Sequence, residues 1–132
     1  MVPSDDRPLG VLALLDDPAP MQSLVARLRS QGFHVDVAHD LAAARTLFFG
    51  AGGHDCLVVG PDVRPSVAVR VLRALRSVDP ELPTATFGPD LQRERAPIRD
   101  AMLRAFHPSS RAGEGALLRF LQKLTPRQDP GR

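Results

Sequence analysis

Short apolar runs alternate with segments of helical periodicity along this sequence, and that alternation is what most narrows the choice of fold. The runs at residues 9–15 and Cys56–Val59 are continuous and too short for buried helices, which is typical of strands covered on both faces. Between them, hydrophobic residues recur at helical spacing. Strands that alternate with helices in this way predict βαβ units and a parallel sheet with helices on both faces.

Turn and capping residues place the expected elements along the chain. Strands are expected at residues 9–15, 33–37, 56–59 and 82–87, and residues 102–106 fit either a fifth strand or part of a helix. Three helices are expected in the first part of the chain: from Pro20 to a stop at Gly32, from a cap at Asp40 to Gly50, and from a cap at Ser66 to the segment before Pro80. A short helix interrupted by Pro97 is expected after Asp90. A last helix is expected from Ser109 or Ser110 to Leu124.

Five such units predict a flavodoxin-like, doubly wound α/β fold, with a five-stranded parallel sheet in the order 2-1-3-4-5. In this architecture any site lies at the carboxyl ends of strands 1 and 3. We expect residues 1–8 to be an N-terminal extension, residues 9–124 to be the domain, and residues 125–132, which contain no core residue, to be a disordered tail.

Composition limits the function classes. The 132 residues suffice for one domain, and no apolar run approaches the roughly 20 residues that span a bilayer. The first residues lack the order of a signal peptide, and Cys56 is the only cysteine, so a cytoplasmic protein is expected. The net charge is only +2, and no aromatic residue is interleaved with the arginines. Neither nucleic acid nor a membrane is therefore expected as a partner.

The two strongest apolar runs end differently. The first is followed by two carboxylates, Asp16 and Asp17, whereas the second is followed by Gly60. Because parallel strands of an open α/β sheet place their chemistry at their carboxyl ends, one strand end presents two acids and the other no side chain. The contrast indicates a site that keeps its framework and has lost a reactive group.

Four segments carry a resemblance to a known family: LLDDP at 14–18, LRSQGFHV at 28–35, AHD at 38–40 and DCLVV at 55–59. Together they resemble a bacterial response-regulator receiver domain. Residues 73–76, residues 79–83 and the pair His107-Pro108 extend the resemblance to nearly the whole of residues 9–124. The first half of the match is specific and the second half is loose.

The resemblance implies a phosphorelay site that this sequence lacks. In that family a partner kinase passes a phosphoryl group to an Asp after strand 3, an acid pair holds Mg²⁺, and a Thr or Ser and a Lys bind the phosphoryl oxygens. Here Gly60, Gly88 and His107 stand at the acceptor, hydroxyl and lysine positions, and only Asp16 and Asp17 remain. Glycine forms no acyl phosphate, because the carboxylate is the nucleophile. Two adjacent acids alone hold Mg²⁺ weakly at best.

We therefore expect a stand-alone pseudo-receiver, which is not an enzyme and has no resident cofactor. It would bind a signalling protein, such as a kinase, an effector or another regulator, without phosphorylation. The resemblance implies an output face formed by the helix after Asp90, the strand at 102–106 and the last helix, with Arg95 and Arg104 on it. The same face would serve a homodimer.

Two alternatives stay open. Asp62, two residues after Gly60, would point to the same face and act as a displaced phosphoacceptor, with Mg²⁺ at Asp16 and Asp17. The other alternative is a small-ligand site in the vacated cleft. Elsewhere, His34, His39 and His54 are not spaced as a metal set and are expected at the surface.

Overall fold

Five parallel strands form one sheet in the order β2-β1-β3-β4-β5. The computed structural model describes residues 8–17, 19–87, 103–105 and 111–124. The strands are β1 (Gly10–Leu14), β2 (His34–Ala38), β3 (Cys56–Val59), β4 (Thr84–Thr86) and β5 (Leu103–Ala105). The predicted parallel sheet and its order 2-1-3-4-5 are confirmed, and residues 103–105 of the segment at 102–106 form a strand.

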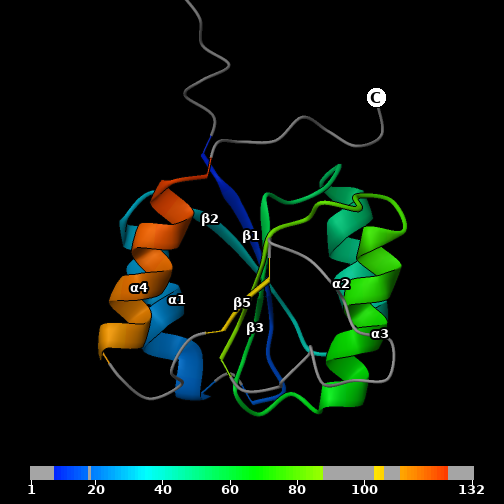
Figure 1. Ribbon diagram of the computed structural model, residues 1–132, viewed down its shortest axis with the longest axis horizontal. Coiled ribbons are helices and arrows are strands. Elements are labelled where there is room, and N and C mark those ends of the chain that lie inside the picture. Colours follow the sequence, from blue (N-terminus) through cyan, green and yellow to red (C-terminus); the bar gives the residue numbers. More distant parts are fainter. Residues whose placement is uncertain (1–7, 18, 88–102, 106–110, 125–132) are drawn as a thin grey trace, which may run out of the picture.

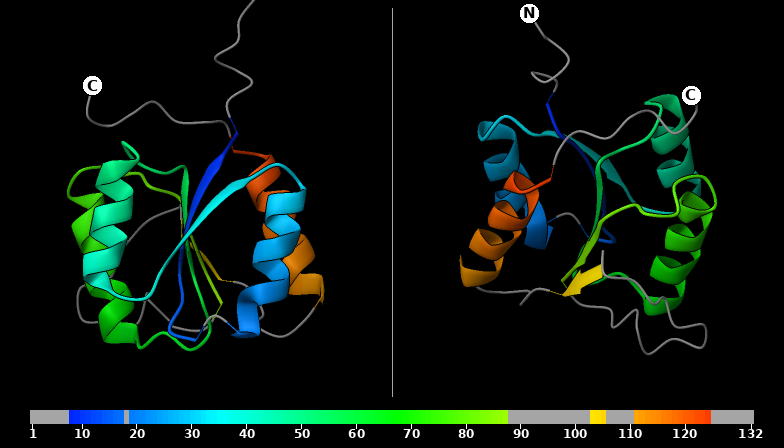
Figure 2. Two further views of the ribbon diagram at one scale, coloured as in Figure 1. Left: turned by 180° about the vertical axis from the view of Figure 1, so that it is seen from behind. Right: turned by 45° about the horizontal axis from the view of Figure 1, so that its top comes forward.

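Helices cover both faces of this sheet. They are the short 3₁₀ helix η2 (Ala19–Met21) and the α-helices α1 (Gln22–Ser30), α2 (Leu41–Gly50), α3 (Pro65–Arg76) and α4 (Arg111–Gln122). Helices α1 and α4 lie on one face, and α2 and α3 on the other (Figures 1 and 2). The fold is therefore the doubly wound α/β architecture that the sequence predicts.

Strand residues alternate between two buried cores. Odd-numbered residues of β1, such as Val11 and Ala13, pack with α1 and α4, whereas Leu12 and Leu14 pack with α2 and α3. Both sets are nearly inaccessible to solvent, which explains why β1 and β3 are continuously apolar. None of the helices in the described ranges combines the length and the apolarity that crossing a bilayer requires.

Local signals set the helix ends. The Asp40 carboxylate accepts a hydrogen bond from the Ala43 amide at 2.8 Å and caps α2 as predicted. Gly32 ends the turn after α1 with a φ of 94°, which glycine adopts without strain. The predicted cap at Ser66 is wrong, because α3 already begins at Pro65 with Arg64 before it. Proline suits the first helical position, where its missing N–H costs nothing.

Several predictions fall on other parts of the chain. Outside the described residues lie positions 1–7 of the N-terminal extension expected at 1–8, the helix expected after Asp90, the starting residues Ser109 and Ser110, and the tail expected at 125–132. They stay predictions.

Candidate functional site

The ends of β1 and β3 lie side by side at the carboxyl edge of the sheet, the lower edge in Figure 1. Leu14 is in register with Val59, and the amide of Gly60 donates a hydrogen bond to the carbonyl of Leu14 at 2.9 Å. The fold thus brings the segment that carries Asp16 and Asp17 next to Gly60. This is the edge at which open α/β sheets hold their ligands.

The space beside Gly60 is filled by core side chains. A Cβ atom on Gly60 would lie 2.7 Å from Cδ2 of Leu15, 3.4 Å from the carbonyl oxygen of Leu14 and 3.6 Å from Cγ of Met21. Leu15 and Met21 are both buried. The φ of Gly60 is not positive, unlike that of Gly32, Gly52 and Gly53. A side chain at position 60 is therefore limited by the space around it rather than by backbone conformation. Leu15 therefore occupies the place where a side chain at position 60 would begin.

The two acids do not form a metal site with other described residues. Asp17 is exposed, and its Oδ1 accepts a hydrogen bond from the Ala19 amide at 3.1 Å, in the turn that leads into η2. Asp16 is also exposed and lines a separate cavity of about 250 Å³. The guanidinium-bearing Arg64 lines the same cavity, which disfavours a bound cation there. Within the described ranges, no three or more His, Cys, Asp or Glu residues are grouped so that they would hold a metal ion.

Asp62 does not join this cavity. It is exposed in the turn after β3, whereas its neighbour Val63 is buried and lines the cavity with Asp16. His39 and Asp40 complete the wall on the side of α2. The structure thus brings Asp16 together with His39, Asp40 and Arg64, and not with Asp62.

The remaining predicted site residues fall on other parts of the chain. Gly88, Arg95 and His107 lie outside the described residues, as does the side chain of Arg104. The backbone of Arg104 lies in β5, paired with Ala85 of β4. Roles for these four residues stay predictions.

A polar cluster that sequence patterns did not reveal lies at the opposite, amino edge of the sheet. His54 was expected at the surface, but only 4% of it is exposed. Its Nε2 donates to Oδ2 of Asp36 at 2.8 Å, and its ring stacks on Phe48 with centroids 5.7 Å apart. The exposed His34 approaches Oδ1 of the same carboxylate at 3.4 Å. Because a carboxylate only accepts, the tautomer of His54 with a proton on Nε2 follows.

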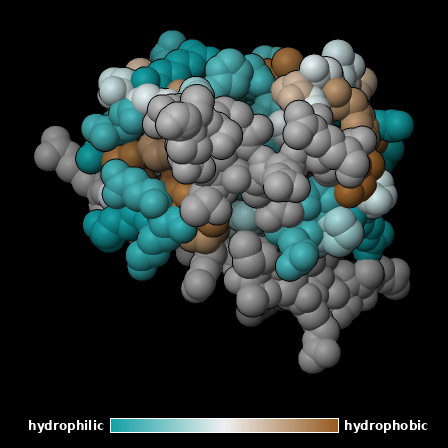
Figure 3. Space-filling model, turned by 90° about the horizontal axis from the view of Figure 1, so that it is seen from above, coloured by the Kyte–Doolittle hydropathy of each residue, from teal (hydrophilic) through white to brown (hydrophobic). Residues whose placement is uncertain are grey.

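Asp55 extends this cluster. It is buried, and its Oδ2 accepts a hydrogen bond from the Gly10 amide at 2.7 Å. The pair His54-Asp55 directly precedes the buried strand β3, which is the one signal in the sequence that polar side chains are buried here. Figure 3 looks onto this end of the molecule, where hydrophilic residues cover much of the coloured surface.

Replacing Asp36 by alanine is expected to lower the free energy of unfolding by about 1–3 kcal/mol, because the buried Nε2–H of His54 loses its acceptor. Asp36→Asn keeps an acceptor and should cost less. His34→Ala, which removes an exposed ring, is the matched control and should change stability by less than about 0.5 kcal/mol. Urea denaturation measures all three. Equal losses for Asp36→Ala and His34→Ala would contradict the assignment.

The lone cysteine offers no reactive group. Cys56 is fully buried within β3, and its burial raises the pKa of its thiol far above the ordinary value, with the nearby Asp55 adding to the effect. The thiolate is the nucleophilic and metal-binding form of cysteine. Cys56 is therefore a core residue.

Comparison with known proteins gives a consistent result at the level of the fold. No protein-family model matches the sequence, and no curated protein is significantly similar to it. Among solved structures, the chemotaxis response regulator CheY4 of Vibrio cholerae is similar with a TM-score of 0.67 and 18% identity, over 89% of this chain and 98% of that one.

Two further structures bear on the site. One is the receiver domain of a sensor histidine kinase from Pseudomonas aeruginosa, with a magnesium ion coordinated in its active-site cleft. Its TM-score is 0.60 at 21% identity, over 96% of this chain and 100% of that one. The other is the response regulator TrrA of Thermotoga maritima in complex with Mg²⁺-BeF, with a TM-score of 0.62 at 17% identity, over 86% of this chain and 98% of that one. The chain has the fold of response-regulator receiver domains.

Proposed function

We propose that this protein is a pseudo-receiver: a receiver-type domain that binds a signalling protein without being phosphorylated. One observation carries the proposal. Gly60 lies at the end of β3 beside the Asp16-Asp17 segment, and the Cβ of any side chain at position 60 would lie 2.7 Å from Cδ2 of the buried Leu15. A site that had lost only its acceptor would have room there. Here the same space belongs to the core.

The charges around Asp16 support the same proposal. The receiver domain from Pseudomonas aeruginosa holds a magnesium ion in its active-site cleft. A Mg²⁺ ion needs several oxygen ligands in octahedral geometry and is usually held by carboxylates together with phosphate. In this protein Asp17 caps the following turn, and Asp16 shares its cavity with Arg64. No aspartate follows β3 directly to complete the set.

A solved relative of this fold is a complex between a histidine kinase and the response regulator TrrA, so proteins of two-component signalling are the partners we propose. We also propose that the face formed by the helix expected after Asp90, β5 and α4, on which Arg95 and Arg104 would lie, takes part in binding or in homodimer formation. A cytoplasmic location and the absence of enzymatic activity belong to the same proposal.

Mg²⁺ is expected to bind weakly or not at all at millimolar concentrations, because the described residues contain no group of three or more His, Cys, Asp or Glu that would hold a metal ion. The Asp40 carboxylate, which lines the cavity with Asp16, already caps α2. Titration of the full chain with MgCl₂, followed by amide NMR shifts of residues 14–17 and 60–64, tests this. A second titration adds beryllium fluoride with Mg²⁺ as a phosphoryl analogue, and no saturating shifts are expected. Saturation at micromolar Mg²⁺ would show that a further oxygen ligand completes a working site.

The alternative of a phosphorelay through Asp62 gains no support from the geometry. Asp62 is exposed, and Val63 rather than Asp62 lines the cavity with Asp16. The alternative of a small ligand in the vacated cleft is limited to the cavity of about 250 Å³ beside Asp16, since Leu15 lies where a side chain at position 60 would begin.

A further inference from the structure

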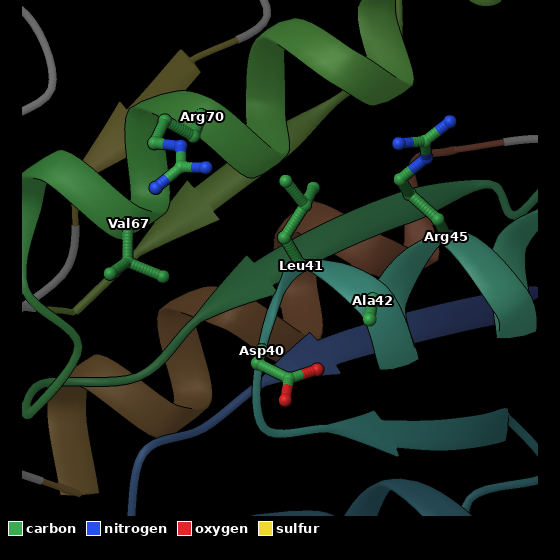
Figure 4. A pocket seen from close by; sticks show the side chains of 6 residues that line it. All are labelled: Asp40, Leu41, Ala42, Arg45, Val67 and Arg70. Carbon is green, nitrogen blue, oxygen red and sulfur yellow. The ribbon is translucent and has the colours of Figure 1, made fainter.

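A groove of about 420 Å³ lies between α2 and α3, on the opposite face of the sheet from α1 and α4. Its apolar part is formed by Leu41, Ala42 and Val67. An arginine from each helix flanks this apolar part, Arg45 from α2 and Arg70 from α3 (Figure 4). Leu41 and Val67 are half-buried, so the groove offers apolar surface that a bound side chain would cover.

The two arginines are available to a ligand. Neither Arg45 nor Arg70 forms an ion pair or a hydrogen bond through its side chain with any residue in the described part of the chain. Both are exposed. The carboxylate of Asp40, which also lines the groove, already accepts from the Ala43 amide. Among the described residues, two guanidinium groups thus flank an apolar floor, and Asp40 is the carboxylate that lines the groove with them.

The charge of this face is one-sided beyond the groove itself. Helix α2 carries one arginine and α3 carries three, and neither helix contains an acidic residue. Exposed helix faces usually carry both acidic and basic residues, because oppositely charged pairs at positions i and i+4 stabilise the helix. The cavity lined by Asp16 shares Asp40 and Val67 with the groove and adds Arg64, but its two carboxylates outnumber its one arginine, so the one-sided charge belongs to α2 and α3 themselves.

The groove's chemistry fits an acidic peptide. Guanidinium groups bind carboxylates in a bidentate manner, and an aliphatic or aromatic side chain between two carboxylates would pack on Leu41 and Val67. At the far end of α2, Phe49 is 47% exposed and lies on the same helical stripe as Ala42 and Arg45. It extends the apolar contact along the helix. Single-stranded nucleic acid fits less well, because no aromatic side chain lies among the groove residues to stack on a base.

We propose that the α2–α3 groove, flanked by Arg45 and Arg70, binds a partner protein through a short segment in which two acidic residues flank an apolar one. This inference rests on the proposed function, since it assigns that interaction module a binding surface. The surface differs from the β5–α4 face and from the carboxyl-edge site, so neither of those has to work for the groove to bind.

Peptide display tests the groove even though the partner is unidentified. The full-length chain is immobilised and random twelve-residue peptides are selected on it, with counter-selection on an Arg45→Glu/Arg70→Glu variant. The enriched peptides are expected to carry acidic residues on both sides of an apolar one. The most enriched peptide is then synthesised with a fluorophore, and its affinity is measured by anisotropy.

Charge-matched variants decide the outcome. Arg70→Glu and, independently, Arg45→Glu should each weaken the peptide by about tenfold or more, which corresponds to about 1.4 kcal/mol. Arg73→Glu is the matched control. It makes the same change on the same helix, at an exposed residue that does not line the groove, and should weaken binding by less than about twofold. Circular dichroism checks that each variant is folded. If one of the two groove variants does not fold, the other still tests the proposal.

The proposal is overturned if no peptide is enriched, if the enriched peptides lack acidic residues, or if Arg73→Glu loses as much affinity as Arg70→Glu. It is also overturned if an oligothymidylate strand binds the groove more tightly than any selected peptide. None of these results depends on whether the protein accepts phosphate. Failure of the groove is therefore distinguishable from failure of the pseudo-receiver proposal, which a phosphoryl adduct would reveal.

Discussion

Gly60→Asp is expected to destabilise the protein rather than restore a working receiver. Its Cβ would lie 2.7 Å from Cδ2 of the buried Leu15, and overpacking of this kind costs about 1–3 kcal/mol. Gly60 is itself buried, and a carboxylate that stays among core side chains without a partner costs more to bury than a neutral polar group, so it adds to this loss. Urea denaturation of wild type and variant, with equal m-values as a check on two-state unfolding, measures the loss.

Two further variants separate the causes. Gly60→Ala retains only the steric part and is expected to cost about 1–3 kcal/mol. In the Leu15→Ala background, where the obstructing atoms are gone, the same Gly60→Ala change should cost less or become stabilising, because the new methyl group enters a cavity. If Gly60→Ala costs the same in both backgrounds, or nothing in either, then Leu15 is not what excludes a side chain at position 60.

Phe48→Ala is expected to lower the free energy of unfolding by about 3–5 kcal/mol, a large part of the stability of a small domain. Phe48 is fully buried in the core beneath α2 and stacks on His54. Its neighbour Phe49 supplies an unusually close control, since the same substitution one residue later removes a ring that is 47% exposed. Phe49→Ala should cost less than about 1 kcal/mol.

If Phe48→Ala and Phe49→Ala lower the free energy of unfolding equally, then contacts on the exposed face of α2 stabilise the protein as much as contacts on its buried face. That result would also weaken the description of Phe49 as an unoccupied contact surface beside the groove. The rings meet edge to face with centroids 5.5 Å apart, so a modest loss at Phe49 is expected and does not count against the assignment.

Local patterns in the sequence predicted the architecture well, because each depends on neighbours in the chain. Continuous apolar runs indicated the buried strands, Asp40 indicated the start of α2, and Gly32 indicated the stop after α1. The misplaced start of α3 has a local cause too. Ser66 is a good capping residue, but Pro65 before it already has helical geometry.

The site was less predictable, because its decisive contacts join distant segments. The sequence shows that Gly60 has no side chain, but the filling of that space by Leu15 depends on the register between β1 and β3. Burial of His54 depends likewise on Asp36, which lies on another strand. Period-two reasoning placed Asp62 on the face of Gly60, but the chain leaves the sheet at Gly60, and Asp62 turns to solvent.

The groove between α2 and α3 could not be predicted from the sequence, for a related reason. Arg45 and Arg70 are ordinary surface residues in their own helices, and nothing in either helix marks them as a pair. Only the packing of α2 against α3 places both beside the apolar residues Leu41 and Val67.

If this receiver fold works without accepting phosphate, incubation with acetyl phosphate and Mg²⁺ leaves its intact mass unchanged, and mass spectrometry of the full chain measures this. A receiver domain that has an aspartate after its third strand, treated in parallel, shows that the donor is active. Wild type and Asp62→Asn are both expected to keep their unmodified mass. A phosphoryl adduct on the wild type that disappears in Asp62→Asn would contradict it and establish Asp62 as the acceptor.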